Sequence, residues 1–340
     1  VLALRGGDVE AELRAVGVPV VSLGLCHPPK APAAMRALLR EVRCFKPDVI
    51  QGWMYHGNLA ASLAWRLAAP QARLVWGIRQ SLYDLRREKP LTRWVIRFSA
   101  WSSRRPTAII YNSHTARAQH ERFGFCEERG MVIDNGFDVE TFSPQPLARA
   151  EVRRMLGLEP AAPLIGLIAR YHPMKGHDVF LKAAALLARR RADVHFLLVG
   201  REVSPRNPAL AAALQHPALA GRVHCLGERH DIARLTAALD IASSSSSWGE
   251  AFPNAIGEAM SCGIPCVATA VGDVPRIIGD TGIVVPMGDA NALADAWSRL
   301  LDVPVETRRA MGEAARRRVQ DNFSIESVAD RYARLYRDTP

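Results

Sequence analysis

Two glutamates in the stretch SSSSSWGEAFPNAIGEAMSCG (residues 243–263) could do chemistry, because an ionised carboxylate accepts hydrogen bonds in a fixed geometry. Pro253 suits the first residue of a helix, where its missing N–H costs nothing. Glu258 then lies roughly 7 Å deeper along that helix, whereas Glu250 precedes it. A glycosidase-like acid and base must flank one bond. The spacing therefore favours two separate acceptors for ligand hydroxyls.

The start of this predicted helix could hold an anion between the two glutamates. Free N–H groups at a helix N-terminus carry partial positive charge and bind phosphates. The backbone amides expected to face such an anion belong to Phe252, Asn254 and Ala255. The alternative for Glu258 is a solvated helix position, and for Glu250 a charge that favours the helix dipole.

A second stretch, IARYHPMKGHDVFLKAAALL (residues 168–187), places two cations in a turn between a strand and a helix. Arg170 and Lys175 lie in that turn, and Gly176 opens an amphipathic helix. Two fixed cations beside a helix N-terminus suit a dianion such as a diphosphate. The alternative is that both are ordinary surface charges. The close approach that glycine permits favours the phosphate site.

These turns must be positioned by strands, and short β-rich runs alternate with helical patterns along the whole chain. That alternation predicts parallel α/β architecture. Predicted strands lie near 18–23, 49–53, 74–78, 108–111 and 131–133, then near 164–169, 195–199, 223–225, 241–243, 265–268 and 283–285. The front-half helices are predicted near 33–45, 59–68, 92–104 and 113–123, and the chain closes with helices near 305–320 and 325–336.

The run NGFDVETFSPQP (residues 135–146) breaks this alternation with turn formers and prolines, which predicts an interdomain linker. We expect an N-terminal domain over 1–144, a C-terminal domain over 145–322, and a final helix over 323–340 that could cross back to the first domain. Ligands of doubly wound sheets bind outside the carboxyl ends of the strands. Two such sheets would face each other across a cleft.

Composition restricts the class of protein. The net charge is +10, of which residues 1–145 contribute +7 (20 Lys and Arg against 13 Asp and Glu). This excess is modest and accompanies no recognition motif, which disfavours nucleic acid as a partner. No apolar run is long enough to span a bilayer. The six cysteines form no CxxC pair and are predicted to be buried thiols in a reducing compartment. No aspartate cluster suggests a metal site.

Together these features resemble a known family. The stretches VIDNGFD, ARYHPMKGHDVFLKAA, EAFPNAIGEAMSCGIPCVAT and VGDVPRII, with the E-x7-E spacing of Glu250 and Glu258, resemble the retaining glycosyltransferases of family 4. The resemblance is most specific over residues 131–290. It implies the GT-B fold: two Rossmann-like, doubly wound domains facing across a cleft.

The resemblance also implies roles for individual residues. Arg170 and Lys175 would bind the donor diphosphate and stabilise the leaving nucleotide. Glu258 would hold the ribose hydroxyls, and Glu250 would meet the transferred sugar. The segment with Phe252, Asn254 and Ala255 would place backbone amides on the sugar and the distal phosphate, and the loop with Gly227 and Glu228 would lie along the base. Candidates for sugar or acceptor contacts in the front half are His56, Arg79 and Gln80, although His56 could equally pack or hydrogen-bond.

The implied activity is metal-independent transfer of a sugar, with retention, from a UDP- or GDP-linked donor to a glycan or lipid-linked acceptor, without a further cofactor. The expected location is the cytoplasm, at the inner face of the membrane if the acceptor is lipid-linked. Alternatives are another GT-B activity such as a sugar-nucleotide epimerase, and a nucleotide-sugar-binding protein without turnover. The chain begins at Val1, and the family's first strand and glycine-rich loop have no counterpart before it. We therefore expect the first strand unit to be missing.

The stretch RREKPLTRWVIRFSAWSSRR (residues 86–105) leaves one further alternative. Trp94, Phe98 and Trp101 recur at helical spacing among arginines, which is typical of an interfacial membrane helix. The same stripe could instead pack on the sheet, and we favour packing because a helix in this position normally covers a sheet. Peripheral membrane contact through the basic front half is compatible with either.

Overall fold

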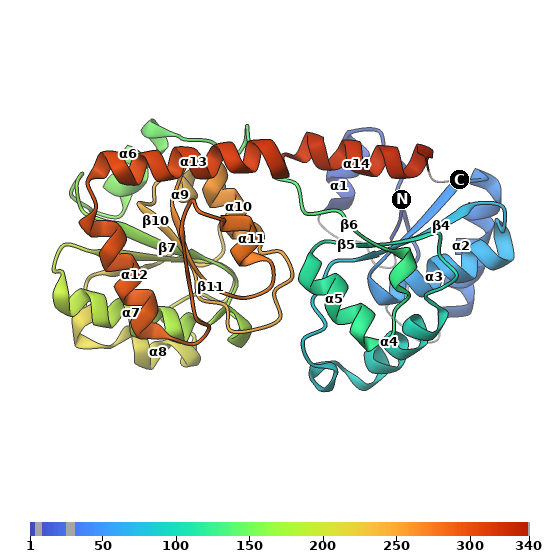
Figure 1. Cartoon of the computed structure of the whole chain (residues 1–340), viewed down its shortest axis with the longest axis horizontal. Coiled ribbons are helices and arrows are strands. Elements are labelled where there is room, and N and C mark those ends of the chain that lie inside the picture. Colours follow the sequence, from blue (N-terminus) through green and yellow to red (C-terminus); the bar gives the residue numbers. More distant parts are fainter. Residues whose placement is uncertain (4–8, 25–30, 339–340) are drawn as a thin grey trace.

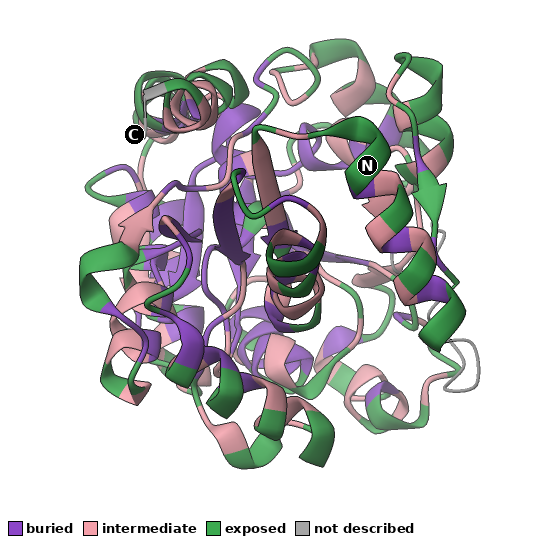
Figure 2. Cartoon of the chain, turned by 90° about the vertical axis from the view of Figure 1, so that its right-hand side faces the viewer, coloured by how far each residue is buried: buried purple, intermediate pink, exposed green. Residues whose placement is uncertain are grey.

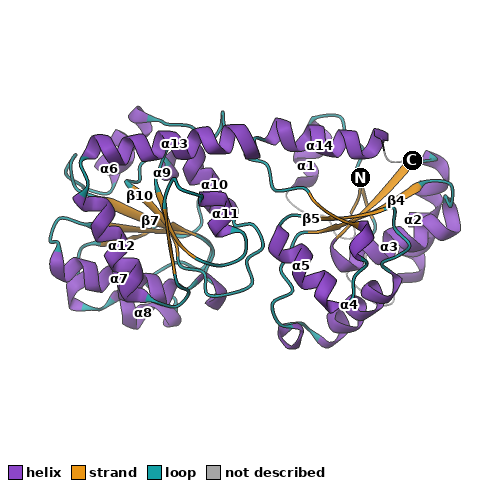
Figure 3. Cartoon of the chain, in the orientation of Figure 1, coloured by secondary structure: helices purple, strands orange, loops and turns teal. Residues whose placement is uncertain are grey.

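The computed structural model describes residues 1–3, 9–24 and 31–338, which form two α/β domains side by side (Figure 1). In each domain a parallel sheet lies between layers of helices (Figure 3). The predicted α/β fold class is confirmed. The predicted strands at 49–53, 108–111, 195–199, 223–225 and 283–285 have the predicted bounds, because their β-branched and apolar runs are bordered by turn residues.

The N-terminal domain contains a four-stranded parallel sheet in the order β3 (Val49–Trp53), β4 (Arg73–Ile78), β5 (Ala108–Tyr111), β6 (Gly130–Val132). Beside it, β1 (Leu2–Ala3) pairs in parallel with β2 (Val21–Ser22). The helices of this domain are α1 (Val9–Ala15), α2 (Ala31–Phe45), α3 (Met54–Ala68), α4 (Pro90–Ser102) and α5 (His114–Phe123), with the 3-10 helices η2 (Leu85–Arg87) and η3 (Glu127–Arg129).

The C-terminal domain contains a six-stranded parallel sheet in the order β9-β8-β7-β10-β11-β12. Its strands are β7 (Leu164–Ile168), β8 (His195–Val199), β9 (Val223–Cys225), β10 (Ile241–Ser244), β11 (Cys266–Thr269) and β12 (Ile283–Val285). The chain winds outward from β7 in one direction and then from β10 in the other. The order therefore reverses between β7 and β10, and such a switch point opens a crevice at the strands' carboxyl ends.

Helices cover both faces of this sheet. The first face is covered by α7 (His177–Arg190), α8 (Pro208–Leu214) and α12 (Ala290–Asp302), and near the second lie α6 (Pro146–Met155), α9 (Ile232–Thr236), α10 (Asn254–Ser261), α11 (Val274–Ile278) and α13 (Val305–Phe323). The 3-10 helices η4 (Pro173–Lys175) and η5 (Pro217–Leu219) lie in loops. Neighbouring strand residues such as Leu164 and Ile165 enter opposite cores, as the strand period of two requires. The strands are buried and the outer helix faces exposed (Figure 2).

The chain returns to the N-terminal domain at its C-terminal end. Helices α13 and α14 (Ile325–Asp338) run end to end along both domains (Figure 1). Val328 of α14 is buried with Val75, Ile110 and Ile133 of the N-terminal domain. Phe137 in the linker forms a bridge with Ser324 at the junction of α13 and α14. The junction of α13 and α14 therefore lies beside the linker, so the chain connects the two domains a second time.

The favoured packing of the aromatic stripe on α4 is wrong. Trp94 is 70% exposed, Phe98 48% and Trp101 68%. The helix instead turns Ile96, Ser99 and Ser102 inward, because it lies against α3, where small side chains allow close approach. The prediction for the thiols also fails in part, since Cys44 at the end of α2 is exposed, and Cys26 lies outside the described residues.

Candidate active site

The strand-end loops at the switch point are tied to each other. After β7 the chain forms η4 and then Gly176, whose φ of +63° lies in the left-handed region. A Cβ at Gly176 would lie 2.0 Å from the backbone oxygen of Ser245, which follows β10. The Ser245 hydroxyl donates to the Gly176 carbonyl at 2.9 Å, and the Ser247 amide donates to the Met174 carbonyl at 2.8 Å. Glycine is thus needed for both the turn and the contact.

The buried serines at the end of β10 hold this arrangement. Ser245 and Ser246 are almost fully buried. The Ser246 hydroxyl donates to Glu250 Oε1 at 2.9 Å, and Thr269 Oγ1 donates to the Ser246 carbonyl at 2.6 Å. The serine run therefore supplies small side chains whose hydroxyls bond within the loops.

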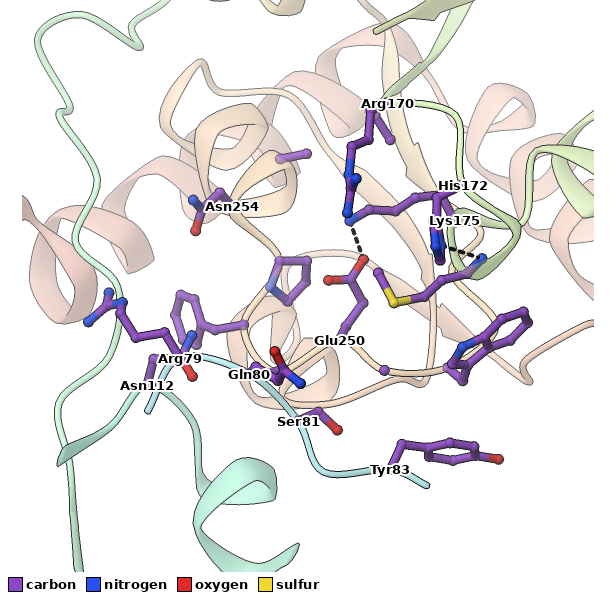
Figure 4. Close-up of a pocket in the computed structure, with 18 of the residues that line it drawn as sticks. Arg79, Gln80, Ser81, Tyr83, Asn112, Arg170, His172, Lys175, Glu250 and Asn254 are labelled. Carbon is purple, nitrogen blue, oxygen red and sulfur yellow. Dashed lines mark hydrogen bonds and ion pairs between the residues drawn. The ribbon is translucent and has the colours of Figure 1, made fainter. Parts of the chain in front are cut away.

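Lys175 and Glu250 form an ion pair across these two loops (Figure 4). Side-chain exposure is 22% for Lys175 and 10% for Glu250, so water screens the pair little. His177, buried behind Lys175, is neutral at ordinary pH: burial, aided by the Lys175 charge, lowers the pKa of His177 to about 4. Lys175 and Arg170 are thus the cations of this side of the site. Arg170 is exposed and has no ion-pair partner among the residues described.

The helix start at α10 faces the same space. The helix begins at Asn254, one residue later than predicted, with Pro253 as its N-cap and no side chain capping it. The Phe252 ring packs with Phe137 and Phe323 at centroid distances of 5.9 and 5.6 Å, which fixes the loop. Glu258 lies in the second turn of α10, where burial raises the pKa of its carboxyl. The uncapped amides leave partial positive charge at the helix start.

A cavity of about 860 Å³ joins these groups to the N-terminal domain. It lies at the carboxyl ends of β4, β7 and β10, and its lining includes most of the predicted site residues: Arg79, Gln80, Arg170, Lys175, Glu250, Phe252, Asn254, Ala255 and Glu258. Figure 4 shows Arg170 and Lys175 beside Glu250, with Arg79, Gln80 and Ser81 approaching from the other domain.

Three predicted residues lie outside this cavity lining. His56 is exposed on the first turn of α3, and Glu228 is exposed after β9. Gly227 has a φ of +68°, and its carbonyl accepts a hydrogen bond from the Gly200 amide at 2.8 Å, so it shapes the loop after β8. Their contacts with a donor or acceptor stay predictions.

The two predicted residues of the N-terminal domain that line the cavity, Arg79 and Gln80, have partners of their own. An Arg79 Nη atom donates to Tyr332 of α14 at 3.1 Å, the other bonds Asn135 in the linker, and the guanidinium lies 5.2 Å from the Trp53 ring centroid. Gln80 donates to Glu88 Oε1 at 2.7 Å. Asn135 also donates to Asn254 Oδ1 at 2.6 Å. A chain of polar contacts therefore connects Arg79 to the start of α10.

Sequence reasoning missed one contact across the cavity. The Arg87 guanidinium lies 4.4 Å from the Trp248 ring centroid, so a cation–π contact joins the two domains at the cavity edge. Trp248 stands two residues before Glu250 in the quoted stretch, which is the signal that could have drawn attention to it. Its partner is 161 positions earlier and could not be found from spacing.

Comparison with known proteins decides the family. Residues 1–141 match the family described as Glycosyltransferase Family 4, and residues 162–303 match Glycosyl transferases group 1. The chain belongs to the family 4 glycosyltransferases. Solved structures agree on the fold: the Anabaena protein Alr3699/HepE in complex with UDP has a TM-score of 0.83 at 22% identity, over 98% of this chain and 90% of that one. The GT-B fold predicted for this family is confirmed.

Two curated relatives of this chain are named as mannosyltransferases. A lipopolysaccharide core biosynthesis mannosyltransferase, LpsB, of Rhizobium meliloti is 29% identical over 71% of this chain and 69% of its own length. A GDP-mannose-dependent monoacylated phosphatidylinositol monomannoside mannosyltransferase of Corynebacterium glutamicum is 30% identical over 61% of this chain and 56% of its own. Several further relatives are matched over only about half of their length.

The described part of this family 4 chain contains neither a helix that could span a membrane nor a cluster of metal-binding side chains. No helix in it is long and apolar enough to cross a membrane. Within the same residues, no group of three or more histidine, cysteine, aspartate or glutamate side chains is arranged to hold a metal ion. The charged side chains that line the cavity belong to arginine, lysine, aspartate and glutamate residues.

Proposed function

We propose that the protein is a retaining glycosyltransferase that moves a sugar from a nucleotide-diphosphate donor to a glycan or lipid-linked acceptor in the cytoplasm. One observation carries the proposal: a single cavity between the domains gathers Arg170, Lys175, the uncapped start of α10 and Glu258. Cations and helix amides suit a diphosphate, and a carboxylate suits the hydroxyls of a ribose. Membership of family 4 supports the same activity.

The chemistry follows from the charge that develops on the donor. The bond between the anomeric carbon and the diphosphate oxygen breaks, its electron pair stays on that oxygen, and a bond to the acceptor oxygen forms. Arg170, Lys175 and the start of α10 would stabilise the leaving diphosphate, which is the main electrostatic demand of the transition state. These organic cations can do this without a metal ion, and no further cofactor is needed.

Membership of family 4 supports retention of configuration, and the contacts of Glu250 argue against a covalent glycosyl-enzyme as the route to it. The Glu250 carboxylate is paired with Lys175 and accepts a hydrogen bond from Ser246, so its oxygen is already engaged and it is a poor attacking group. We propose that the acceptor hydroxyl attacks from the face that the diphosphate leaves. The departing phosphate oxygen then takes the acceptor proton, and Glu250 orients the transferred sugar.

Experiment decides whether the base of the donor is uracil or guanine, because proteins similar to this chain are associated with each of the two. The Corynebacterium relative is named for GDP-mannose, and the Anabaena protein has been solved with UDP-glucose. Thermal unfolding should be measured with UDP, GDP, UDP-glucose and GDP-mannose. A nucleotide at a hundred times its Kd adds about 2.7 kcal/mol to stability, which raises the Tm measurably. If no nucleotide raises the Tm, the proposal is wrong.

Variants test where the nucleotide binds and which residue is needed for sugar transfer. Lys175→Ala should abolish most of the Tm shift and lower kcat by about 100-fold or more, because a preorganised charge on the leaving group is lost. Lys182→Ala is the matched control: this lysine lies on α7, the helix that follows Lys175, is 70% exposed and pairs with Asp178 at 3.6 Å. The anomeric configuration of the product, measured by NMR, tests retention. An epimerised nucleotide sugar without transfer would contradict the proposed activity.

A further inference from the structure

The outer face of α4 is apolar and uncovered. Leu91, Trp94, Phe98 and Trp101 are 70%, 70%, 48% and 68% exposed. At about 100° per residue they fall within an arc of about 80° on the helix. Phe98 and Trp101 contact each other at a centroid distance of 5.4 Å, and both rings remain open to solvent. Folded proteins seldom leave such a patch exposed unless it binds something.

Positive charge surrounds this face. Residues 86–105 contain seven basic residues and one acidic residue, Glu88, which gives +6. Arg97 is exposed on the helix beside the aromatic residues, and Arg104 and Arg105 are exposed just after it. The Arg105 guanidinium lies over the Trp101 ring, 5.1 Å from its centroid, which keeps a positive charge against the aromatic patch. Tryptophan bordered by arginine suits the boundary between lipid headgroups and acyl chains.

We propose that the outer face of α4 docks the protein on an anionic lipid bilayer. The aromatic residues would enter the headgroup region, and the arginines would bind lipid phosphates and other headgroup anions. Charge complementarity favours this occupant over a second copy of the chain, because two copies facing each other through α4 would bring two +6 segments together.

The docked face lies next to the candidate active site. Tyr83, Asp84, Arg87 and Glu88 line the cavity and lie in the segment that leads into α4 at Pro90. Binding through α4 therefore holds the cavity close to the membrane surface, where a lipid-linked acceptor could reach it. This last step rests on the proposed function, whereas the docking surface rests on exposure and charge alone.

Vesicle co-sedimentation tests the docking surface. The full chain should bind vesicles of phosphatidylcholine with phosphatidylglycerol, and bind vesicles of phosphatidylcholine alone at least about tenfold less. The double variant Trp94→Ser/Trp101→Ser should lose about tenfold or more of the binding to anionic vesicles. Phe45→Ser is the matched control, since Phe45 is 78% exposed on the same domain, and it should bind as the wild type does. Equal binding by the double variant and the wild type overturns the proposal.

A charge variant and two further readouts separate the outcomes. Arg97→Glu should weaken binding to anionic vesicles, whereas Arg154→Glu, an exposed arginine of the other domain, should not. A lipid-free dimer that the double variant abolishes would assign the face to a second copy and overturn the proposal. Nucleotide-induced Tm shifts are measured in parallel. A wild type that binds nucleotide but no vesicle contradicts docking alone, and one that binds vesicles but no nucleotide contradicts the proposed function alone.

Discussion

At the scale of single residues, opposite charges are paired within the site. Lys175 neutralises Glu250, and a buried carboxylate without such a partner would be strongly destabilising. A bound diphosphate would compete with Glu250 for Lys175. Arg170 lies exposed at the same cavity and can supply further positive charge. The ion pair therefore holds both side chains at the place where the diphosphate is proposed to bind.

The carboxyl of Glu258 should make stability depend on pH. Burial raises its pKa in the folded protein, so the folded state binds a proton there more tightly than the unfolded chain. The free energy of unfolding must then fall as the pH rises from the ordinary glutamate pKa through the raised one. Glu258→Gln cannot ionise. It should gain stability relative to the wild type with rising pH, by about 1.4 kcal/mol for each unit by which the pKa is raised.

Urea unfolding of both proteins at a series of pH values from 4 to 7 measures this difference. Glu159→Gln is the control, because Glu159 is exposed in the loop after α6. Its substitution should leave the pH dependence as it is in the wild type. If the free energies of unfolding of Glu258→Gln and the wild type change in parallel with pH, burial does not raise the pKa of the Glu258 carboxyl.

At the scale of elements, the site depends on two turns that fit together. The turn from η4 into α7 needs the positive φ of Gly176, and the loop after β10 passes so closely that its carbonyl occupies the space of a side chain. Lys175 stands directly before this glycine and Glu250 follows the facing loop. The distance between the two charges is therefore set by how closely the two turns pack.

Gly176→Ala should cost stability for two reasons that a second variant separates. Alanine at a left-handed position costs about 1–2 kcal/mol, and the clash with the Ser245 carbonyl adds about 1–3 kcal/mol. Gly221→Ala is the control, since Gly221 has a φ of +71° and open space where a Cβ would lie. Urea unfolding should show the greater loss for Gly176→Ala, together with weaker nucleotide binding. Equal losses would mean that the loops can separate at no cost.

At the scale of the whole molecule, contacts between the domains hold the two halves of the cavity opposite each other. Asp273 of the C-terminal domain accepts hydrogen bonds from the amides of His114 and Thr115 at the start of α5, at 2.9 Å each. Although burial opposes its charge, these bonds hold the pKa of Asp273 below its usual range. Asp134 pairs with Arg276 and, at 3.5 Å, with Arg331 of α14. Charge-assisted hydrogen bonds therefore hold the two domains against each other.

Removing the Asp273 carboxylate should loosen the domains. Asp273→Ala leaves two amides of α5 without their partner, which should cost about 2 kcal/mol, as the loss of a strong helix cap does. Small-angle X-ray scattering should show a larger radius of gyration, and urea unfolding the lower stability. Asp280→Ala, which changes an exposed aspartate of the same domain, is the control. If both variants match the wild type, Asp273 does not fasten the domains.

The sequence by itself determined the elements and the composition of the site. Alternating apolar runs bordered by turn residues predicted strands such as 195–199 and 283–285, because strand and turn preferences act between near neighbours. The same local logic identified Gly176 at a strand-to-helix turn and the helix behind Pro253. Because parallel strands end at one edge of a sheet, Arg170, Lys175, Glu250 and Glu258 could be expected near each other, and all four line one cavity.

Only the tertiary structure decided which partners these residues have. Lys175 meets Glu250, Arg87 meets Trp248, and Asp273 caps α5 through contacts between residues 75 or more positions apart, which no local pattern specifies. The aromatic stripe of α4 shows the same limit. Helical spacing identified the face of Trp94, Phe98 and Trp101, but its exposure depends on how α3 receives the opposite face of Ile96, Ser99 and Ser102. Periodicity defines the faces of a helix, and long-range packing decides which one is buried.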